Sequence, residues 1–287
     1  MTTTVRPTAS AVATTGPSGR VRRSRSAARY GTPLSVAGVL VALVAGWQLA
    51  VWIGQVPRYQ VAAPADAAGA FGSHPSLLAH RIWVTGQGAV LGLAAAAALA
   101  LTMAVVVLRW PIVRTPLTAY ALVFRTLPIV GVAPLFTLVT GHGLGTSVAC
   151  VVVVTVFTLL ISALDGLESV PAQVRELEDL YATPFLRRVR LGAFPSAVGS
   201  LLVGLRVAAP MAVLAALLAE WLSGLGGLGS LMTESLANRE TDLLWATSVV
   251  AALLGLVAYG LPSLLVSWAD RRGYAVVPGA GTEGGRP

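Results

Sequence analysis

The chain has 287 residues, of which 55% are hydrophobic and only 11% are charged, and its formal net charge is +8. Soluble globular domains carry about 25% charged residues, so the composition excludes a soluble domain and predicts an integral membrane protein. All basic residues are arginines that lie beside apolar runs rather than along one polar face, which argues against a nucleic-acid-binding protein.

Residues 1–33 are rich in Thr, Ser, Pro, Gly and Arg and contain almost no large apolar side chain. Such a segment cannot bury enough apolar surface to fold, so a disordered, basic, cytoplasmic tail is predicted. Its arginines either lie near anionic lipid headgroups or only help to orient the spans that follow. Residues 271–287 are expected to form a second, loose cytoplasmic tail.

Six apolar segments follow the first tail, and a bilayer core requires about 20 such residues per helix. They lie at approximately 34–54, 82–108, 117–140, 146–164, 197–222 and 243–268. The first run is longer than the roughly 7–15 apolar residues of a secretory signal peptide, so it is interpreted as a span. Pro128, Pro134 and Pro210 lie within spans and predict kinks there. The sequence therefore predicts an all-α membrane protein with about six transmembrane helices over 34–270.

Arginines are distributed unequally on the two sides of these spans. Fifteen of them lie in the two tails, in the connection 109–116 and in the loop 170–195, whereas Arg58, Arg81 and Arg239 lie on the opposite side. Positively charged residues concentrate on the cytoplasmic side of membrane proteins. Both termini and the loop 170–195 are therefore expected in the cytoplasm, in a chain that crosses the plasma membrane several times.

The loop 170–195 is long for a connection between two helices. Val174, Leu177 and Tyr181 share one helical stripe, and charged, mainly acidic residues cover most of the remaining surface. This spacing predicts a short amphipathic helix over about 172–181.

A second short helix is predicted from Pro184 to Leu191, because Thr183 is a good N-cap and proline is favoured in the first turn. Its arginines are expected to point toward water or phosphate, and Gly192 can end it before Pro195 opens the fifth span. Such a pair can lie flat on a membrane, but its acidic half does not suit an anionic surface. A protein partner on the cytoplasmic side is therefore favoured.

The spacing of this loop resembles the cytoplasmic "EAA" loop of ABC importer permeases, in which Glu-Ala-Ala is followed at fixed intervals by Gly, Ile and Leu-Pro. The corresponding residues are Glu176, Leu177, Glu178, Ala182, Gly192, Phe194 and Pro195. Only the first and the last of these keep the residue type of the family. The flanking stretches FRTLPIVGVAPLFTLVTGHGLGTS, GLR, AEW and GGLGSLM are similar to sulfonate-, taurine- and nitrate-type permeases, and the resemblance covers roughly 34–275.

The resemblance implies a type I ABC importer permease with a two-helix cytoplasmic coupling loop that docks on a separate ABC ATPase. The residues assigned to docking are Glu176, Leu177, Glu178, Tyr181, Ala182, Thr183, Pro184 and Pro195. It also implies a homodimer of permease subunits, an extracytoplasmic substrate-binding protein, and a small solute as cargo, with the anions alkanesulfonate, taurine and nitrate favoured. The chain itself is expected to bind no cofactor, because the partner subunit hydrolyses ATP.

No catalytic or metal site is recognisable in the sequence. It contains no G-x-x-x-x-G-K-[ST] phosphate loop, and its histidines have no partner at a spacing typical of metal ligands. Arg125, Arg206 and Glu220 are ionisable residues in or at the ends of spans, so each is a candidate for the pathway or a gate as well as for a structural role. Arg206 is expected to pair with the acidic face of the loop or to extend to the inner interface, and Glu220 to lie at the outer mouth.

The alternative function is an ion-coupled secondary transporter that needs no ATPase. Such transporters are commonly built from inverted repeats with ionisable groups near mid-membrane, and no convincing repeat relates 34–140 to 146–268. A membrane enzyme is the third possibility, and no catalytic constellation supports it.

Overall fold

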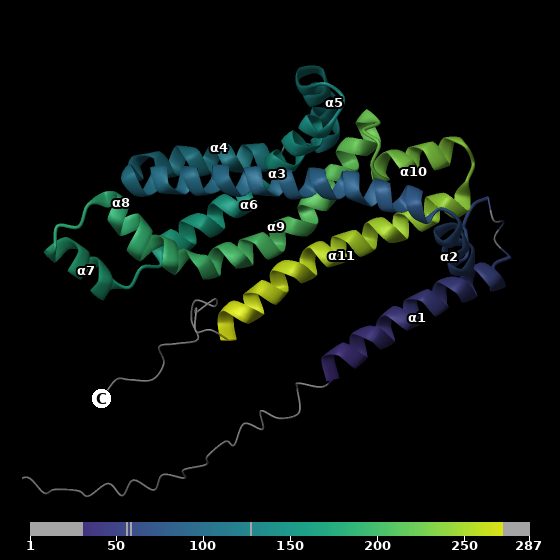
Figure 1. The fold of residues 1–287 in the computed structure, drawn as a ribbon, viewed down its shortest axis with the longest axis horizontal. Coiled ribbons are helices and arrows are strands. Elements are labelled where there is room, and N and C mark those ends of the chain that lie inside the picture. The colour runs from purple at the N-terminus through teal and green to yellow at the C-terminus, as the bar shows by residue number, and fades with distance from the viewer. Residues whose placement is uncertain (1–30, 56, 58, 127, 272–287) are drawn as a thin grey trace, which may run out of the picture. The chain divides into compact units, whose positions relative to one another are not determined.

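The computed structural model describes residues 31–55, 57, 59–126 and 128–271, and within these ranges every regular element is a helix (Figure 1). The elements are α1 (Gly31–Ile53), α2 (Pro64–Ser73), α3 (Pro75–Arg109), η1 (Pro111–Val113), α4 (Arg114–Thr126), α5 (Ile129–Thr140), α6 (Leu144–Glu168), α7 (Ala172–Leu180), α8 (Phe185–Arg188), η2 (Val189–Ala193), α9 (Phe194–Ser223), α10 (Leu228–Ala237) and α11 (Thr241–Arg271). The all-α fold expected from the sequence is confirmed. Most of the two predicted tails lies outside the described residues.

The chain divides into two compact units, Met1–Trp47 and Gln48–Pro287. The described part of the first unit is the stretch 31–47 of α1, and the helix continues to Ile53 in the second unit. The second unit contains α2 to α11 and all the contacts on which the candidate site depends.

Four long helices, α3, α6, α9 and α11, form the body of the second unit: α6 packs against α3 and α9, and α11 packs against α9 (Figure 1). The largest cluster of buried side chains is built mainly from alanines and leucines of α3 and α6, with Ala96, Ala100 and Ala104 spaced along one face of α3. Small side chains let helix backbones approach closely in a membrane. The helices α7 and α8 lie at one end of this body, and α2 and α10 lie at the other (Figure 1).

Glycines mark the closest helix crossings. A Cβ atom added at Gly92 of α3 would collide with the side chain of Val151 in α6. At Gly166, near the end of α6, an added Cβ would lie 2.8 Å from the Cα and 3.0 Å from the carbonyl oxygen of Ala197 in α9. Since backbone atoms cannot turn aside as a flexible side chain can, α6 and α9 are tightly packed where α6 leads into the loop 170–195.

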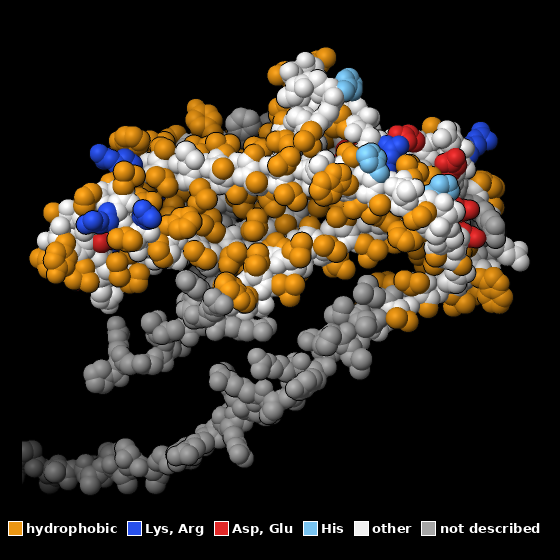
Figure 2. All heavy atoms as spheres, in the orientation of Figure 1, with side chains coloured by type: hydrophobic (Ala, Val, Ile, Leu, Met, Phe, Trp, Pro, Cys, Tyr) orange, Lys and Arg blue, Asp and Glu red, His pale blue; other side chains and the backbone are white. Residues whose placement is uncertain are grey.

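Four segments of the described part are long and apolar enough to cross a membrane: Pro75–Arg109, Leu144–Glu168, Phe185–Ser223 and Thr241–Ala269. These segments contain four of the six spans expected from the sequence. Two shorter apolar helices, Val41–Ile53 and Ile129–Thr140, coincide with parts of the other two expected spans, the first and the third. Figure 2 shows hydrophobic side chains along the long helices of the second unit and charged side chains mainly at its two ends, as in a multi-pass membrane protein.

The third expected span, 117–140, is two helices rather than one. Helix α4 ends at Thr126 and α5 begins at Ile129, with Pro128 in an extended conformation at the N-cap of α5. Proline lacks the N–H that would continue the helix and disfavours helical geometry in the residue before it. The expected kink at Pro128 is therefore a full break, whereas Pro134 remains inside α5.

Candidate functional site

The loop 170–195 folds into an elbow, which consists of α7, the turn 181–184 and α8. Helix α7 spans Ala172–Leu180 and ends in a Schellman motif: the N–H of Thr183 donates to the carbonyl of Glu178 (2.8 Å), and that of Ala182 donates to the carbonyl of Asp179 (3.0 Å). Ala182 has a φ of 44°, in the left-handed region that favours glycine. A residue with a Cβ pays on the order of 1 kcal/mol there. The sharp turn is therefore kept although the glycine of the family pattern is absent.

Arg188 of α8 holds the turn together. Its Nη1 forms an ion pair of 2.7 Å with Oδ1 of Asp179, and its Nε donates to the carbonyl of Thr183 at 2.8 Å. Its Nη2 also donates to the carbonyl of Glu178 at 3.4 Å. The expectation that this arginine points toward water or phosphate is therefore wrong, because it binds the C-terminal end of α7 instead.

The expected N-cap at Thr183 is also absent. The N-cap of α8 is Pro184, and no side chain makes a capping hydrogen bond there. Thr183 contributes its carbonyl to Arg188, as described above.

The second arm of the elbow does not end at Gly192, contrary to expectation. Helix α8 continues through the π-helical turn η2 into α9, so that Phe185–Ser223 is one helical segment of 39 residues. Pro195 accounts for the π-turn, because it cannot donate a hydrogen bond to the carbonyl of Leu191 and its ring crowds that carbonyl. Gly192 has a different role: it is buried beneath Glu178, whose carboxylate would collide with a Cβ atom at this position.

Arginines also hold the base of the elbow to the spans. The Nε of Arg175 donates to the carbonyl of Val170 at 3.2 Å, and its Nη2 donates to the carbonyl of Glu168 at the end of α6. The carboxylate of Glu168 forms an ion pair of 2.8 Å with Arg114 of α4. The elbow is thus tied to α4 and α6 through charged side chains and free helix-end carbonyls, which are strong acceptors for such donors.

The surface that remains exposed at the turn is largely apolar. Leu180, Tyr181 and Leu186 are exposed by 78%, 77% and 79%, and Leu177 by 53%. Of the helical stripe Val174, Leu177 and Tyr181, Val174 alone lies against the main buried cluster. We call Leu177, Leu180, Tyr181 and Leu186 the apolar tip. An exposed apolar patch on a rigid support is typical of a protein interaction site.

The two acidic docking residues expected from the sequence lie in different surroundings. Glu176 is exposed on α7 beside the apolar tip, whereas Glu178 is half-buried against Gly192. Sequence reasoning did not assign Leu180 of α7 or Leu186 of α8 to docking, although leucines among the charged residues of two short helices are a recognisable signal of a binding surface.

Of the ionisable span residues whose side chains the structure describes, Arg206 and Glu220 have different partners and do not contact each other. Arg206 of α9 lies over the ring of Tyr259 of α11, with 4.7 Å between the guanidinium carbon and the ring centroid, and its Nη2 donates to the tyrosine hydroxyl. This cation–π contact is found in place of the pairing with the acidic face of the loop, which was one of the two expected arrangements. The side chain of Arg125 lies outside the described part of the structure.

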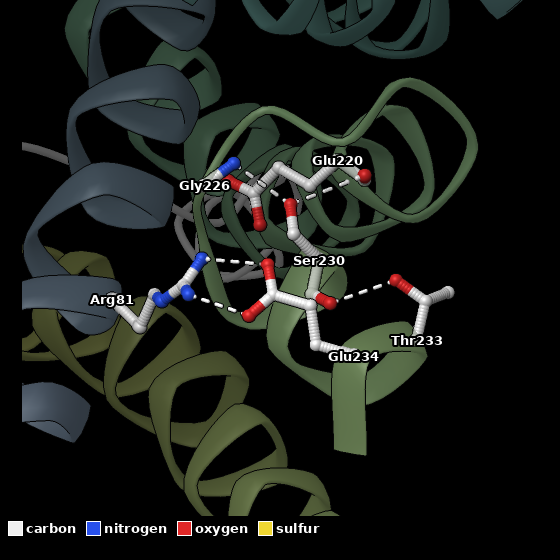
Figure 3. Close-up of polar contacts among 6 residues, drawn as sticks. All are labelled: Arg81, Glu220, Gly226, Ser230, Thr233 and Glu234. Carbon is white, nitrogen blue, oxygen red and sulfur yellow. Dashed lines mark hydrogen bonds and ion pairs between the residues drawn. The ribbon is translucent and has the colours of Figure 1, made fainter. Parts of the chain in front are cut away.

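Glu220 is buried at the end of α9 near α10, with 1% of its surface exposed. Its Oε2 accepts hydrogen bonds from Oγ1 of Thr85 at 2.8 Å and from the N–H of Gly229 at 3.0 Å. Its carbonyl accepts a bond of 3.3 Å from Oγ of Ser230 (Figure 3). Glu220 therefore lies inside a junction of α3, α9 and α10, and sequence reasoning did not find its partner Thr85.

Among the described residues, no group of three or more His, Cys, Asp or Glu side chains is placed to hold a metal ion. The features that the described residues do provide are an apolar tip on a rigid elbow, a guanidinium stacked on an aromatic ring within the spans, and a buried carboxylate.

Comparison with known families assigns this architecture. Residues 88–272, which include the elbow, match the family described as the inner membrane component of binding-protein-dependent transport systems. The chain belongs to this family. Members of it are permease subunits of ABC transporters and are not enzymes.

Individual relatives agree with this assignment. The permease is 26% identical to a probable ABC transporter permease protein of Haemophilus influenzae over 79% of this chain and 91% of the relative. It is 31% identical to the formylaminopyrimidine transport permease protein ThiX of Halalkalibacterium halodurans over 52% of this chain and 61% of the relative. It is 23% identical to the putative aliphatic sulfonates transport permease protein SsuC of Bacillus subtilis over 49% of this chain and 51% of the relative.

The fold is also similar to a solved structure. A chain of the MetNI methionine ABC transporter, determined in inward-facing conformations, superposes with a TM-score of 0.54 at 18% identity. The match covers 71% of the permease and 99% of that chain. At this identity the likeness shows the fold, which is that of a type I ABC importer permease.

Proposed function

We propose that the permease works as one half of a two-fold transport pathway and that its elbow docks on a cytoplasmic ABC ATPase. The observation that carries this proposal is the apolar tip, held out from the spans by the bonds of Arg188 and Arg175. Pre-organised apolar side chains lose little entropy on binding, so a rigid tip favours tight docking. ATP is hydrolysed by the partner, and this chain binds no cofactor.

The test replaces Leu180 of the tip with aspartate and compares it with Leu236→Asp at the other end of the unit. Leu236 is similarly exposed, by 63%, but lies on α10. Truncating a central interface residue commonly costs about 2 kcal/mol or more, which weakens association roughly 30-fold. Leu180→Asp should insert in the membrane but lose the co-purifying ATPase, whereas Leu236→Asp should retain it. Wild-type recovery of the ATPase with Leu180→Asp would refute this docking surface.

Glu176 is proposed to contribute charge to the same interface. It is exposed beside the apolar tip and has no ion pair among the described residues. Losing one partner of a desolvated charge pair costs roughly 2–5 kcal/mol. Glu176→Lys should therefore reduce ATPase recovery tens-fold, and unchanged recovery would remove Glu176 from the interface.

Both termini are proposed to be cytoplasmic, on the same side as the elbow. The arginine distribution supports this orientation, and α2, which ends at Ser73, lies at the end of the second unit opposite α7 (Figure 1). Single cysteines at Ser24 and Ser73, in a Cys150→Ala background, should label differently with an impermeant thiol reagent. In intact cells, position 73 should label and position 24 should not. The reverse pattern would refute the orientation.

The cargo is proposed to be a small anion such as an alkanesulfonate, taurine or nitrate, delivered by an extracytoplasmic substrate-binding protein. A half-buried arginine within a span, Arg206, supplies positive charge at a position where bare charge is costly and is therefore commonly functional. Similarity to the sulfonate permease of Bacillus subtilis supports the same class. Uptake of a labelled anion should disappear with Arg206→Gln but survive Tyr259→Phe, which keeps the ring beneath the guanidinium.

A planar heterocycle is the second candidate cargo. The stack of Arg206 on Tyr259 offers a flat surface, and the relative from Halalkalibacterium halodurans is a formylaminopyrimidine permease. With such a cargo, Tyr259→Leu should abolish uptake while Tyr259→Phe retains it. Uptake measured with labelled sulfonate and labelled pyrimidine in parallel decides between the two classes.

Two copies are proposed because one permease chain provides half of a two-fold pathway. Mass measurement of the purified assembly should give two permease chains with the ATPase. A single permease chain in an active assembly would refute the homodimer. The permease purified without its ATPase should hydrolyse no ATP.

A further inference from the structure

Helix α10 has an unusual N-terminal cap. The first N–H groups of a helix lack partners within the helix and are commonly capped by the side chain of the preceding residue. Here that residue is Gly227, which has no side chain. The N–H of Leu228 donates instead to Oγ1 of Thr85 at 2.9 Å, and that of Gly229 donates to Oε2 of Glu220 at 3.0 Å. The cap of α10 is thus supplied by α3 and α9.

The two capping side chains are bound to each other and are buried. Oγ1 of Thr85 donates to Oε2 of Glu220 at 2.8 Å, and the two residues are exposed by 0% and 1%. A carboxyl group at a helix N-terminus also interacts favourably with the helix dipole. A single hydroxyl and a single carboxyl oxygen therefore join three helices in the protein interior.

The loop before α10 is shaped around Glu220. A Cβ atom added at Gly227 would collide with the Glu220 carboxylate, and one added at Gly229 would lie 2.9 Å from the Glu220 Cβ. Oγ of Ser230 bonds the N–H of Gly226 at 2.8 Å and the carbonyl of Glu220 at 3.3 Å (Figure 3). Gly227 and Gly229 of GGLG are therefore required for close approach to Glu220, whereas Gly226 has a φ of 79°, in the left-handed region that favours glycine.

The rest of α10 leads from this buried cap to an exposed cleft. Glu234, midway along α10, accepts two hydrogen bonds from Arg81 of α3, at 3.2 and 2.6 Å (Figure 3). Helix α10 ends at Ala237 with Asn238 as its C-cap, and the next residue, Arg239, is left-handed with a φ of 61°. The cleft that follows has a volume of about 670 Å³, and its charged and polar lining includes Tyr59, Asp66, His74, Arg239, Glu240 and Asp242.

We propose that Thr85 and Glu220 are positioning residues that make α10 move as one body with α9, so that a partner bound at the cleft acts on α9 through α10. The assignment of that partner as the substrate-binding protein rests on the proposed function, whereas the shared cap does not. Glu220 accordingly acts as a hydrogen-bond acceptor inside the protein rather than as a charge in the pathway.

Hydrogen exchange of the full-length permease in lipid nanodiscs tests the cap. Thr85→Val removes both bonds of the hydroxyl, and Thr85→Ser keeps them. The valine variant should increase exchange at residues 224–230 at least tenfold, and the serine variant should match wild type. Glu220→Gln keeps an acceptor oxygen and should stay close to wild type, whereas Glu220→Leu should resemble Thr85→Val. Wild-type exchange in Thr85→Val, or a loss in Glu220→Gln equal to that in Glu220→Leu, would overturn the cap.

Stimulation of the ATPase in the assembled transporter tests transmission. The substrate-binding protein is added outside proteoliposomes, and the increase in ATP hydrolysis is measured. In Thr85→Val the basal rate should be unchanged, but the increase should be at least fivefold smaller than in wild type. Thr85→Ser should match wild type in both rates. Faster exchange with unchanged stimulation would overturn transmission through α10.

Two further outcomes can be distinguished from a failure of the cap itself. If the wild-type assembly shows no stimulation by any binding protein, the proposed partner is wrong, and the exchange experiment alone decides the cap. If Thr85→Val does not reach the membrane, Glu220→Leu removes the bonds of Oε2 to Thr85 and to the N–H of Gly229. Wild-type exchange and stimulation in Glu220→Leu would then overturn the inference.

Discussion

Replacing Gly166 with alanine tests how tightly α6 and α9 are packed at the base of the elbow. The new Cβ would lie 2.8 Å from the Cα, 3.0 Å from the Cβ and 3.0 Å from the carbonyl oxygen of Ala197. Two of these three atoms belong to the backbone, so α6 and α9 must separate locally. Ser169, whose hydroxyl donates to the carbonyl of Gly166 at 2.6 Å, would move with them.

The expected cost is the difference between two opposing effects. Inserting a methyl group into a closely packed contact costs about 1–3 kcal/mol. Alanine is better than glycine inside a helix by roughly 0.5–1 kcal/mol. Because the added Cβ meets backbone atoms, we take the cost of overpacking as about 2–3 kcal/mol, the upper part of that range. After the helix-propensity gain is subtracted, Gly166→Ala should lower the free energy of unfolding of the permease by about 1–2 kcal/mol. Gly255→Ala in α11 provides the matched control, because nothing lies within 4 Å of its added Cβ and only the helix-propensity gain remains.

Thermal unfolding of the purified permease in one detergent measures both variants. Gly166→Ala should melt several degrees below wild type, and Gly255→Ala at or above it. Adding Ala197→Gly should restore little stability to Gly166→Ala, because it removes a Cβ but leaves the Cα and the carbonyl oxygen in place. Equal melting temperatures for Gly166→Ala and Gly255→Ala would refute the packing argument.

Three further changes test other parts of the structure. Ala182→Gly should relieve the left-handed alanine and stabilise the elbow by about 1 kcal/mol, seen as slower hydrogen exchange over 178–184, and faster exchange would contradict this. Arg188→Met should destabilise the elbow by about 1 kcal/mol and speed up hydrogen exchange over 178–184, because the turn loses an ion pair and two hydrogen bonds to backbone carbonyls. Unchanged exchange would show that these contacts are dispensable. Cys150 is fully buried, so a membrane-permeant thiol reagent should modify it only on unfolding, and rapid native labelling would contradict that burial.

The sequence was most informative where structure depends on local pattern. The long spans could be predicted because apolar length is a property of one segment, and the first arm of the elbow because Val174 and its neighbours repeat with helical spacing. Helix α7 ends at Leu180, within one residue of the expected boundary.

Predictions from the sequence were wrong where a residue had more than one available partner. Gly192 can end a helix, but here the chain continues, since a π-turn accommodates Pro195 and Glu178 needs the space that glycine leaves. Arg188 could face water, lipid or the end of α7, and three acceptors at that helix end decided its direction. Neither outcome is encoded in spacing alone.

The junction around Glu220 could not be predicted for a different reason. It joins Thr85 to residues of α9 and α10 that lie more than a hundred positions later, through bonds of single atoms. The contact of Arg206 with Tyr259 likewise depends on how α9 and α11 pack. Without the packing of the spans, the sequence showed only that isolated polar residues within apolar runs have a function or a partner.

The uninterrupted helical segment Phe185–Ser223 fixes an angle as well as a distance. An α-helix turns by about 100° per residue, so deleting one residue from its α-helical part would rotate the direction of Leu186 by that amount relative to Glu220. The π-turn at Val189–Ala193 already holds an additional residue, so a deletion there can convert it to an ordinary turn and leave both ends facing as before. A one-residue deletion should therefore be tolerated in the π-turn. Elsewhere in this helix it would turn Leu186 and the elbow away from their present direction relative to Glu220.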